Sequence, residues 1–322
     1  MKILPIGGYF ELELGPKKTF IHEDGVLLNS GRNALEFVLT SLPELSHLWV
    51  PFYTCEVVLS PLNKLGISYS FYRINKHLEL QQDIALGKGD YLLYTNYFGI
   101  KDEYIKSLAN RYGGHLIVDN AQALFAEPIS DISTVYSPRK FVGIPDGGIA
   151  YCIHNNDVKL YNQDFSYDRF SHLIKRIDIG ATEAYVDFKE NGSKLQNLPI
   201  LQMSKLTKAL LYNIDFEEIR LRRMANFMVL HNALKDTNAF AIPDISTFKC
   251  PMVYPYLPND ELLKQKLIEN KVFVATYWPN VFEWCNKGDW EYTLAEKTCY
   301  LPIDQRYGEA EMNAIINIIN NR

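Results

Sequence analysis

Short, nearly uninterrupted apolar runs alternate along the first half of the chain with segments whose apolar positions recur at helical spacing. Continuous apolar runs are typical of strands in a parallel sheet that helices cover on both faces, and the other segments predict amphipathic helices. The predicted strands are 47–50, 68–74, 91–95, 115–119 and 148–153, and the predicted helices are 30–39, 55–65 and 102–111. This alternation indicates an α/β fold rather than an α+β fold.

The pattern changes in the second half of the chain. Residues 156–235 are more polar and helical, and they end in a long amphipathic helix at 215–234. The elements that follow are strands at 252–257, 272–276 and 298–301 and helices at 260–269 and 309–319, in the order of a compact α+β module. We therefore predict a large domain at residues 1–235, which includes an irregular N-terminal arm, and a smaller C-terminal α+β domain at residues 236–322.

The composition narrows the classes of partner. The 322 residues are 47% hydrophobic and 22% charged, with a formal net charge of -5 and no basic run, so neither nucleic acid nor an anionic membrane is favoured. The five cysteines form no C-x-x-C pair and the seven histidines form no H-E-x-x-H motif, which argues against a metal site and fits a reducing compartment. No signal-peptide core and no membrane-spanning run is present, so we expect a cytoplasmic protein.

An acid ends one of the predicted strands. Asp119 follows the apolar run 116–118 and so lies at the carboxyl end of a central strand, where open α/β sheets bind ligands. A carboxylate there can pair with the protonated pyridine nitrogen of pyridoxal phosphate (PLP), whose ring then accepts carbanion charge. The simpler interpretation is a turn-forming or capping aspartate. Gln122 follows within one turn and can reach the ring hydroxyl of the cofactor, unless it is a solvated or capping amide.

A lysine lies in a turn-rich loop further along the chain. The segment 137–148 contains two prolines and three glycines around Lys140, which predicts a fixed, irregular loop rather than a helix face. A lysine that binds PLP covalently must be held still and partly buried. A single lysine is more often a surface residue. This one, however, lies in a loop that leads into the apolar strand 148–153 and follows the acid motif at a distance that a crossover can span.

Two weaker signals accompany the acid and the lysine. Ser30 and Gly31 begin a predicted helix, and the unpaired N–H groups of a helix N-terminus can bind a phosphate, to which Ser137 could add a hydroxyl. Most such helix starts bind nothing. Phe52 or Tyr53, in a turn between a strand and a helix, could stack on a flat ring, although core packing is the commoner role of such side chains.

These motifs occur in an order that resembles one known family. The segments LNSGRNAL, VPFYTCEVV, NYFGIKDEYIKSLA, LIVDNAQALFA, YSPRKFVGIPDGG and CYLPIDQRY are similar to those of the DegT/StrS family of PLP-dependent nucleotide-sugar aminotransferases, over nearly the whole chain. The resemblance implies the aspartate-aminotransferase (type I) fold and a homodimer with its sites at the subunit interface. It also implies transfer of an amino group, usually from glutamate, to a keto sugar on a nucleotide, for the biosynthesis of surface polysaccharide or a related sugar.

The same resemblance implies roles for individual residues. Lys140 matches the lysine that binds PLP covalently, Asp119 matches the partner of the pyridine nitrogen, and Gln122 matches the residue on the side of the ring hydroxyl. The remaining cofactor contacts that it implies are Gly31 and Arg32 at the phosphate, through their main-chain N–H groups, and Phe52 or Tyr53 against the ring.

The chain departs from the family pattern at three places. Asn96 precedes the Tyr97-Phe98-Gly99 segment where the family usually has histidine, and Val135 replaces a serine five residues before the lysine. Of the usual G-x-N-x-R-M-S segment, only the final Met-Ser remains within 198–204. These changes affect the expected surroundings of the phosphate and the substrates, and they leave the acid and the lysine unchanged.

Two alternatives remain open. Other type I PLP enzymes, such as desulfurases or aldolases, share the acid and the lysine, whereas relatives that dehydrate a sugar carry histidine in place of the lysine, so Lys140 favours amino transfer. The second alternative is a family member that keeps the fold but acts as a binding or regulatory protein. The altered phosphate surroundings are the observation in its favour.

Overall fold

The computed structural model describes residues 7–154 and 157–321. A seven-stranded sheet forms its centre, with the spatial order β1-β7-β6-β5-β4-β2-β3. The strands are β1 (Val26–Leu28), β2 (His47–Pro51), β3 (Ser68–Tyr72), β4 (Asp90–Thr95), β5 (Leu116–Asn120), β6 (Ser133–Tyr136) and β7 (Gly148–Tyr151). All neighbours from β3 to β6 are parallel, and β7 is antiparallel to both β6 and β1. The predicted α/β class with a mostly parallel sheet is confirmed.

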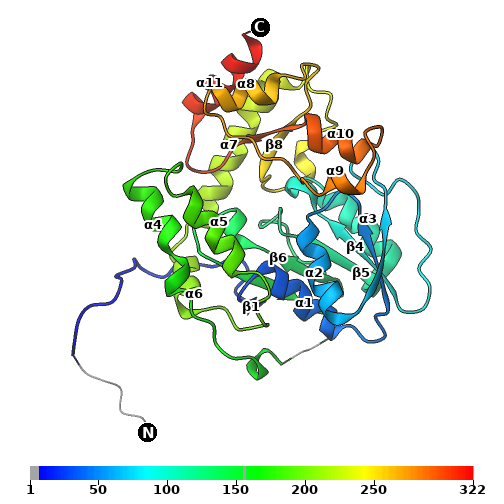
Figure 1. Cartoon of the computed structure of the whole chain (residues 1–322), viewed down its shortest axis with the longest axis vertical. Coiled ribbons are helices and arrows are strands. Elements are labelled where there is room, and N and C mark those ends of the chain that lie inside the picture. The colour runs from blue at the N-terminus through cyan, green and yellow to red at the C-terminus, as the bar shows by residue number, and fades with distance from the viewer. Residues whose placement is uncertain (1–6, 155–156, 322) are drawn as a thin grey trace.

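Helices bury both faces of this sheet, which explains the continuous apolar runs. Successive strand residues alternate between two buried clusters: Leu93 and Ile117 join the cluster that contains α1 (Gly31–Ser41) and α2 (Leu59–Leu65), while Leu92 and Leu116 join the other. The second cluster includes residues of α3 (Asp102–Tyr112) and continues into the C-terminal part of the chain. Figure 1 shows the sheet with these helices around it.

The rest of the chain is mainly helical and ends in a small second sheet. The helices are α4 (Ser171–Asp178), α5 (Tyr185–Lys194), α6 (Lys205–Leu211), α7 (Phe216–Leu234), α8 (Leu263–Glu269), α9 (Val281–Trp284), α10 (Trp290–Lys297) and α11 (Glu309–Asn320). β8 (Val253–Tyr256) and β9 (Cys299–Pro302) pair antiparallel, and α7 packs against α11 (Figure 1). The division of the chain at 235/236 falls directly after α7 and stays a prediction.

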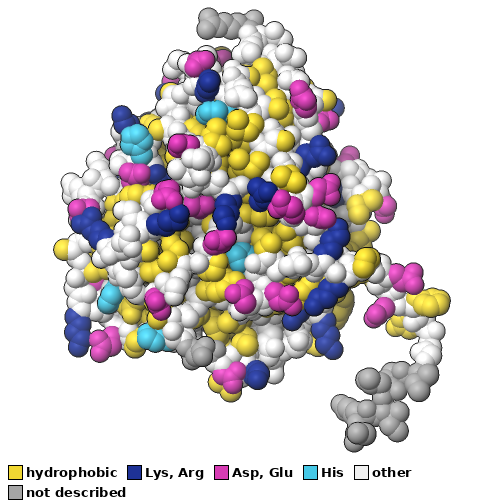
Figure 2. All heavy atoms as spheres, turned by 180° about the vertical axis from the view of Figure 1, so that it is seen from behind, with side chains coloured by type: hydrophobic (Ala, Val, Ile, Leu, Met, Phe, Trp, Pro, Cys, Tyr) yellow, Lys and Arg dark blue, Asp and Glu magenta, His cyan; other side chains and the backbone are white. Residues whose placement is uncertain are grey.

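The elements differ from the predicted ones in a few places. β1 and β6 were not expected, and residues 272–276 do not form the expected strand but make one isolated bridge between Ala275 and Tyr300. Within the described part of the chain, no helix is both long and apolar enough to cross a membrane. Figure 2 shows the face opposite to that of Figure 1, where acidic and basic side chains are interspersed with apolar ones.

Candidate active site

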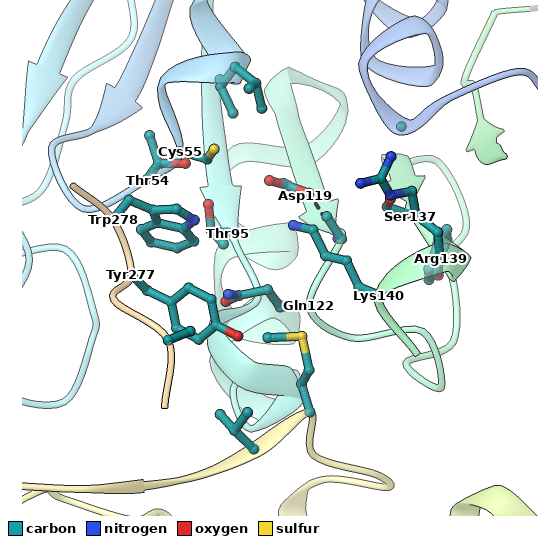
Figure 3. A pocket seen from close by; sticks show the side chains of 18 of the residues that line it. Thr54, Cys55, Thr95, Asp119, Gln122, Ser137, Arg139, Lys140, Tyr277 and Trp278 are labelled. Carbon is teal, nitrogen blue, oxygen red and sulfur yellow. Dashed lines mark hydrogen bonds between the residues drawn. The ribbon is translucent and has the colours of Figure 1, made fainter. Parts of the chain in front are cut away.

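A cavity of about 640 Å³ opens at the carboxyl ends of the parallel strands (Figure 3). The strand register pairs Thr95 of β4 with Asp119 of β5, and Asp119 with Val135 of β6, so these three residues lie side by side on the sheet. All three line the cavity, whose walls are completed by α5 and by residues 273–278. This edge of an open α/β sheet is the usual place for a ligand.

Asp119 presents a carboxylate to the cavity from the centre of the sheet. Its Oδ1 accepts a hydrogen bond from the backbone N–H of Ala121 at 2.9 Å, which fixes the side chain. Burial raises the pKa of Asp119, while the positive charge of Lys140 and the Ala121 hydrogen bond act in the opposite direction. Because ionisation is costly in the free protein, the carboxylate gains from a cationic partner such as a protonated ring nitrogen.

Lys140 reaches the cavity from a turn after β6. It ends the single-turn helix η4 (Pro138–Lys140), in which its N–H donates to the carbonyl oxygen of Ser137 at 3.2 Å. Figure 3 shows its amino group turned toward the carboxylate of Asp119. The expectation of a partly buried lysine is wrong for the single chain: the side chain is exposed, because it extends into the open cavity.

Two glycines set the path of the chain after the lysine. Gly147 has a φ of +106°, which glycine adopts without strain, and its N–H donates to the carbonyl oxygen of Asn29 at 2.9 Å. A Cβ on Gly148 would lie 2.1 Å from the carbonyl oxygen of Ser30. The start of β7 can therefore approach the start of α1 this closely only because glycine has no Cβ. The glycine pair therefore brings the lysine loop against the start of α1.

A buried acid anchors the same loop. Asp146 accepts a hydrogen bond from Ser166 Oγ at 2.6 Å and another from the Thr207 hydroxyl, and it forms an ion pair with Nε of Arg169 at 3.2 Å. Burial raises the pKa of Asp146, and these partners act against that rise. The network holds the lysine loop to α6 and to the segment before α4.

The residues predicted to hold a phosphate come together on one side of the cavity. Ser30 caps α1 by accepting a hydrogen bond from the N–H of Asn33 at 3.1 Å. Gly31, Arg32 and Ser137 line the cavity, and a Cβ on Gly31 would lie 3.1 Å from that of Ser137. The first N–H groups of a helix have no partner within the helix, so α1 offers donors to an anion there.

Three buried polar atoms at the cavity lack a hydrogen-bond partner among the described residues. They are Nε2 of Gln122, Oγ1 of Thr54 and Oγ1 of Thr95. Gln122 is oriented by its Oε1, which accepts a hydrogen bond from the backbone N–H of Phe98 at 3.2 Å. Leaving a buried polar atom unpaired costs about 1–3 kcal/mol, so such atoms indicate a polar ligand. Together with Asp119, they fit a substituted pyridine ring such as that of PLP.

Phe52 and Tyr53 are not brought to the cavity. Phe52 stacks on Phe71 with ring centroids 4.7 Å apart, and the guanidinium of Arg73 lies 4.3 Å from the Phe52 centroid. Tyr53 is fully buried, and its hydroxyl forms a hydrogen bond with that of Tyr300. The geometry gives no support to stacking of either ring on a cofactor, because both rings are committed to packing inside the protein.

The cavity also contains residues that the sequence analysis missed. Thr54 and Cys55 follow the two aromatic residues and line the cavity in their place, and Arg139 lines it next to Lys140. Thr95 could have been found by the signal that identified Asp119, since it also ends a buried strand. Nothing in the sequence distinguishes Cys55 or Arg139 from other turn residues.

The three departures from the family pattern have different surroundings in the structure, and only one of them lines the cavity. Nδ2 of Asn96 donates to Oδ1 of Asp102 at 2.8 Å and to Oδ1 of Asn120 at 3.0 Å, so this buried amide supports the start of α3. Val135 faces the cavity with an apolar side chain. The segment Leu198–Ser204 is not part of the cavity lining, and its last residue caps α6.

The chain has no match among family models or among curated proteins. Solved structures do match it. A DegT/DnrJ/EryC1/StrS aminotransferase from Brucella abortus gives a TM-score of 0.64 at 16% identity, over 92% of this chain and 85% of its own. A sugar aminotransferase from Streptococcus pneumoniae in its PLP form gives 0.65 at 17% identity, over 94% and 88%. DesI with its TDP-sugar product gives 0.64 at 14% identity, over 92% and 79%.

These similarities show the fold: the chain has the architecture of the type I, PLP-dependent sugar aminotransferases. The fold expected from the sequence resemblance is thereby confirmed. At such low identities the match concerns the course of the backbone, and the chemistry of the cavity rests on the residues that line it.

Proposed function

We propose that this protein is a PLP-dependent aminotransferase that moves an amino group from an amino acid, with glutamate as the expected donor, to a keto sugar linked to a nucleotide. The observation that carries the proposal is the convergence of Asp119 and Lys140 on one cavity at the carboxyl ends of the central strands. The unpaired polar atoms of Gln122, Thr54 and Thr95 support it, because they fit the substituents of the cofactor ring.

Asp119 holds the cofactor nitrogen in its protonated form. Bound PLP supplies a ring that withdraws electrons and stabilises negative charge at the amino-bearing carbon of the substrate. With Oδ1 of Asp119 held by Ala121, Oδ2 is left for the ring nitrogen. The buried setting that raises the pKa of Asp119 also limits screening by water, which strengthens the pairing of the carboxylate with a cation.

Lys140 would hold the cofactor covalently through Nζ, and the same amino group, when free, would move a proton at the amino-bearing carbon of the substrate. Its backbone is fixed by the η4 turn and by the glycines that follow, whereas its exposed side chain is free to swing within the cavity. This combination lets one amino group serve both steps. Gln122 donates through Nε2 on the side of the ring hydroxyl.

The space beside the cavity suits the proposed amino acceptor, a keto sugar linked to a nucleotide. A second hollow of about 730 Å³ shares Arg32, Val57 and Leu195 with the cavity, so a sugar near Lys140 could continue into a nucleotide there. DesI, one of the matching structures, was solved in the presence of its TDP-sugar product. Both points support a nucleotide-linked keto sugar as acceptor. The role in the biosynthesis of surface polysaccharide or a related sugar rests on the sequence resemblance alone.

We also propose that the protein is a cytoplasmic homodimer with its sites at the subunit interface. Exposed apolar side chains on α4 and α5 support a partner surface beside the cavity, since Ile177 is 85% exposed, Val186 is 63% exposed, and Phe188 is 47% exposed while also lining the cavity. A second copy that covers this surface would close the cavity further.

The visible spectrum of the PLP-loaded protein, before and after glutamate is added, tests the proposal. We expect an absorbance band that is lost in Lys140→Ala and retained in the exposed control Lys287→Ala, and glutamate should convert the band to that of pyridoxamine phosphate. A protein that takes up no PLP would contradict the proposal. A protein that binds PLP and responds to no amino donor would favour the binding or regulatory alternative.

A further inference from the structure

Two arginines line the same side of the cavity without an acidic partner. Arg32 lies in the first turn of α1, and Arg139 lies in η4 directly before Lys140. Neither forms an ion pair within 4.0 Å with any residue that the structure describes. Arg32 donates one hydrogen bond to the carbonyl oxygen of Leu195 at 3.0 Å, and the guanidinium of Arg139 lies 5.9 Å from the ring centroid of Phe188.

The surroundings of the two guanidinium groups are unfavourable for positive charge. Burial lowers the pKa of Arg139 first of all, the charge of Arg32 lowers it further, and burial also lowers the pKa of Arg32. Two like charges that are partly withdrawn from water repel each other strongly. Asp146 offsets part of this cost for Arg139, as Cys55 and Glu56 do for Arg32, but none of them forms an ion pair with either arginine. A bound anion would supply counter-charge in contact with both guanidinium groups.

Other groups beside the arginines also suit an anion. The N-terminus of α1 reaches the cavity at Gly31 and Arg32, and the Ser137 hydroxyl lies next to it without a hydrogen-bond partner among the described residues. Val135 lines the adjoining wall and offers no donor. In Figure 3, Ser137 and Arg139 lie on one side of Lys140, while Gln122 and Tyr277 lie on the other.

We infer that Arg32 and Arg139 form a two-guanidinium clamp for a phosphate monoester dianion, and that this dianion is the phosphate of PLP. The inference rests on the proposed function. It adds Arg139 to the site and changes the role of Arg32 from a main-chain contact to a charged one. Guanidinium groups bind phosphate through paired N–H donors. Both arginines belong to one chain, so in this proposal the charged contact with the phosphate needs no residue of a second subunit.

The clamp is tested by comparing PLP with pyridoxal, which lacks the phosphate. Both aldehydes are titrated against the wild type, Arg139→Gln, Arg32→Gln and the exposed control Arg222→Gln on α7, and the ratio of their dissociation constants is the readout. We expect each clamp variant to lower the preference for PLP over pyridoxal by about tenfold to a hundredfold, as for loss of a charge-assisted hydrogen bond. The control should keep the wild-type ratio.

Thermal unfolding of the PLP-free protein supplies a readout that does not depend on Lys140. Inorganic phosphate should raise the unfolding temperature of the wild type and of Arg222→Gln, and should have little effect on the Arg32→Gln/Arg139→Gln double variant. Without phosphate, Arg139→Gln should be at least as stable as the wild type, because it relieves the repulsion. This outcome also excludes misfolding as the cause of lost binding.

The failures of the clamp and of the proposed function are distinguishable. If the wild type binds PLP on Lys140 and both single variants keep the wild-type preference over pyridoxal, the clamp is wrong and the aminotransferase proposal stands. Uridine diphosphate is added in the same thermal unfolding assay. If it stabilises the wild type but not the variants, while the variants keep the wild-type preference for PLP, the arginines serve the nucleotide and the assignment to PLP is wrong. If the wild type binds no PLP, both proposals fail.

Discussion

The backbone N–H of Phe98 donates a hydrogen bond to Oε1 of Gln122 at 3.2 Å, and this bond decides which end of the amide meets the cavity. With Oε1 occupied, Nε2 remains the unpaired donor at the cavity. Phe98 has a φ of +57° and is followed by Gly99 at +72°, so the amide also supports a tight turn after β4. One side chain thus connects the stability of the fold with the chemistry of the site.

Replacing this glutamine should cost stability even without a ligand. Gln122→Ala leaves the buried N–H of Phe98 without its acceptor, and we expect the free energy of unfolding to fall by about 1–3 kcal/mol. Urea unfolding of the PLP-free protein measures this. Gln265→Ala, at an exposed position on α8, should change stability by no more than about 0.5 kcal/mol. Equal stability of Gln122→Ala and the wild type would show that the bond is not formed.

Asp119→Asn should separate stability from function. The pKa of Asp119 is raised in the folded protein, so the unfolded chain loses this proton first, near the ordinary value of 3.8. Above that pH the carboxyl therefore lowers the stability of the fold. The PLP-free variant should therefore be at least as stable as the wild type at pH 7, with a difference that shrinks toward low pH. Its amino transfer from glutamate should be slower by about 10²–10³-fold.

The reverse result would be informative. If Asp119→Asn is less stable than the wild type at neutral pH, the carboxylate is already satisfied within the free protein. The site would then gain nothing from a cationic ring nitrogen. A rate close to that of the wild type would likewise remove the role of the carboxylate in the reaction.

Because β7 approaches the start of α1 closely, one added methyl group at Gly148 should destabilise the fold. In Gly148→Ala the new Cβ would overlap the carbonyl oxygen of Ser30, so backbone must move, and we expect a loss of about 1–3 kcal/mol in the free energy of unfolding. Gly288→Ala, where a Cβ meets nothing within 4 Å, is the matched control. Denaturant unfolding of the two variants gives the comparison, and equal stabilities would refute the proposed contact.

The anchor of the lysine loop is open to a similar test. Asp146→Ala removes the acceptor of two hydroxyl groups and one partner of the buried Arg169, so we expect a loss of about 3 kcal/mol in the free energy of unfolding. The exposed Asp236→Ala serves as control. If thermal unfolding shows the same midpoint for both variants, Asp146 does not hold the loop.

Local sequence patterns were sufficient for the centre of the fold. The central strands β4 and β5 are apolar runs that are almost completely buried, so their pattern alone was sufficient. Asp119 and Lys140 were singled out together, as an acid at the end of a buried strand followed by a lysine in a turn-rich loop. β1 and β6 were missed because they have only three and four residues and are fixed by pairing, β1 with β7 and β6 with both β5 and β7. The segment 272–276 has a strand pattern but only one bridging partner.

The side chains of turns could not be assigned from local pattern. Phe52 and Tyr53 have the chemistry to stack on a ring, yet Phe71 holds Phe52 against the core and Tyr300 holds Tyr53 within it. The same turn presents Thr54 and Cys55 to the cavity. Which residue of a turn faces a ligand depends on tertiary packing, and no spacing rule gives that information.

Reductive trapping measures the central claim most directly. The native protein is incubated with PLP, treated with borohydride and digested, and the modified peptide is identified by mass. One reduced PLP group per chain on Lys140, absent from Lys140→Ala, is the result that this account predicts. Modification spread over exposed lysines, with Lys140 unmodified, would show that the lysine beside Asp119 does not hold a cofactor.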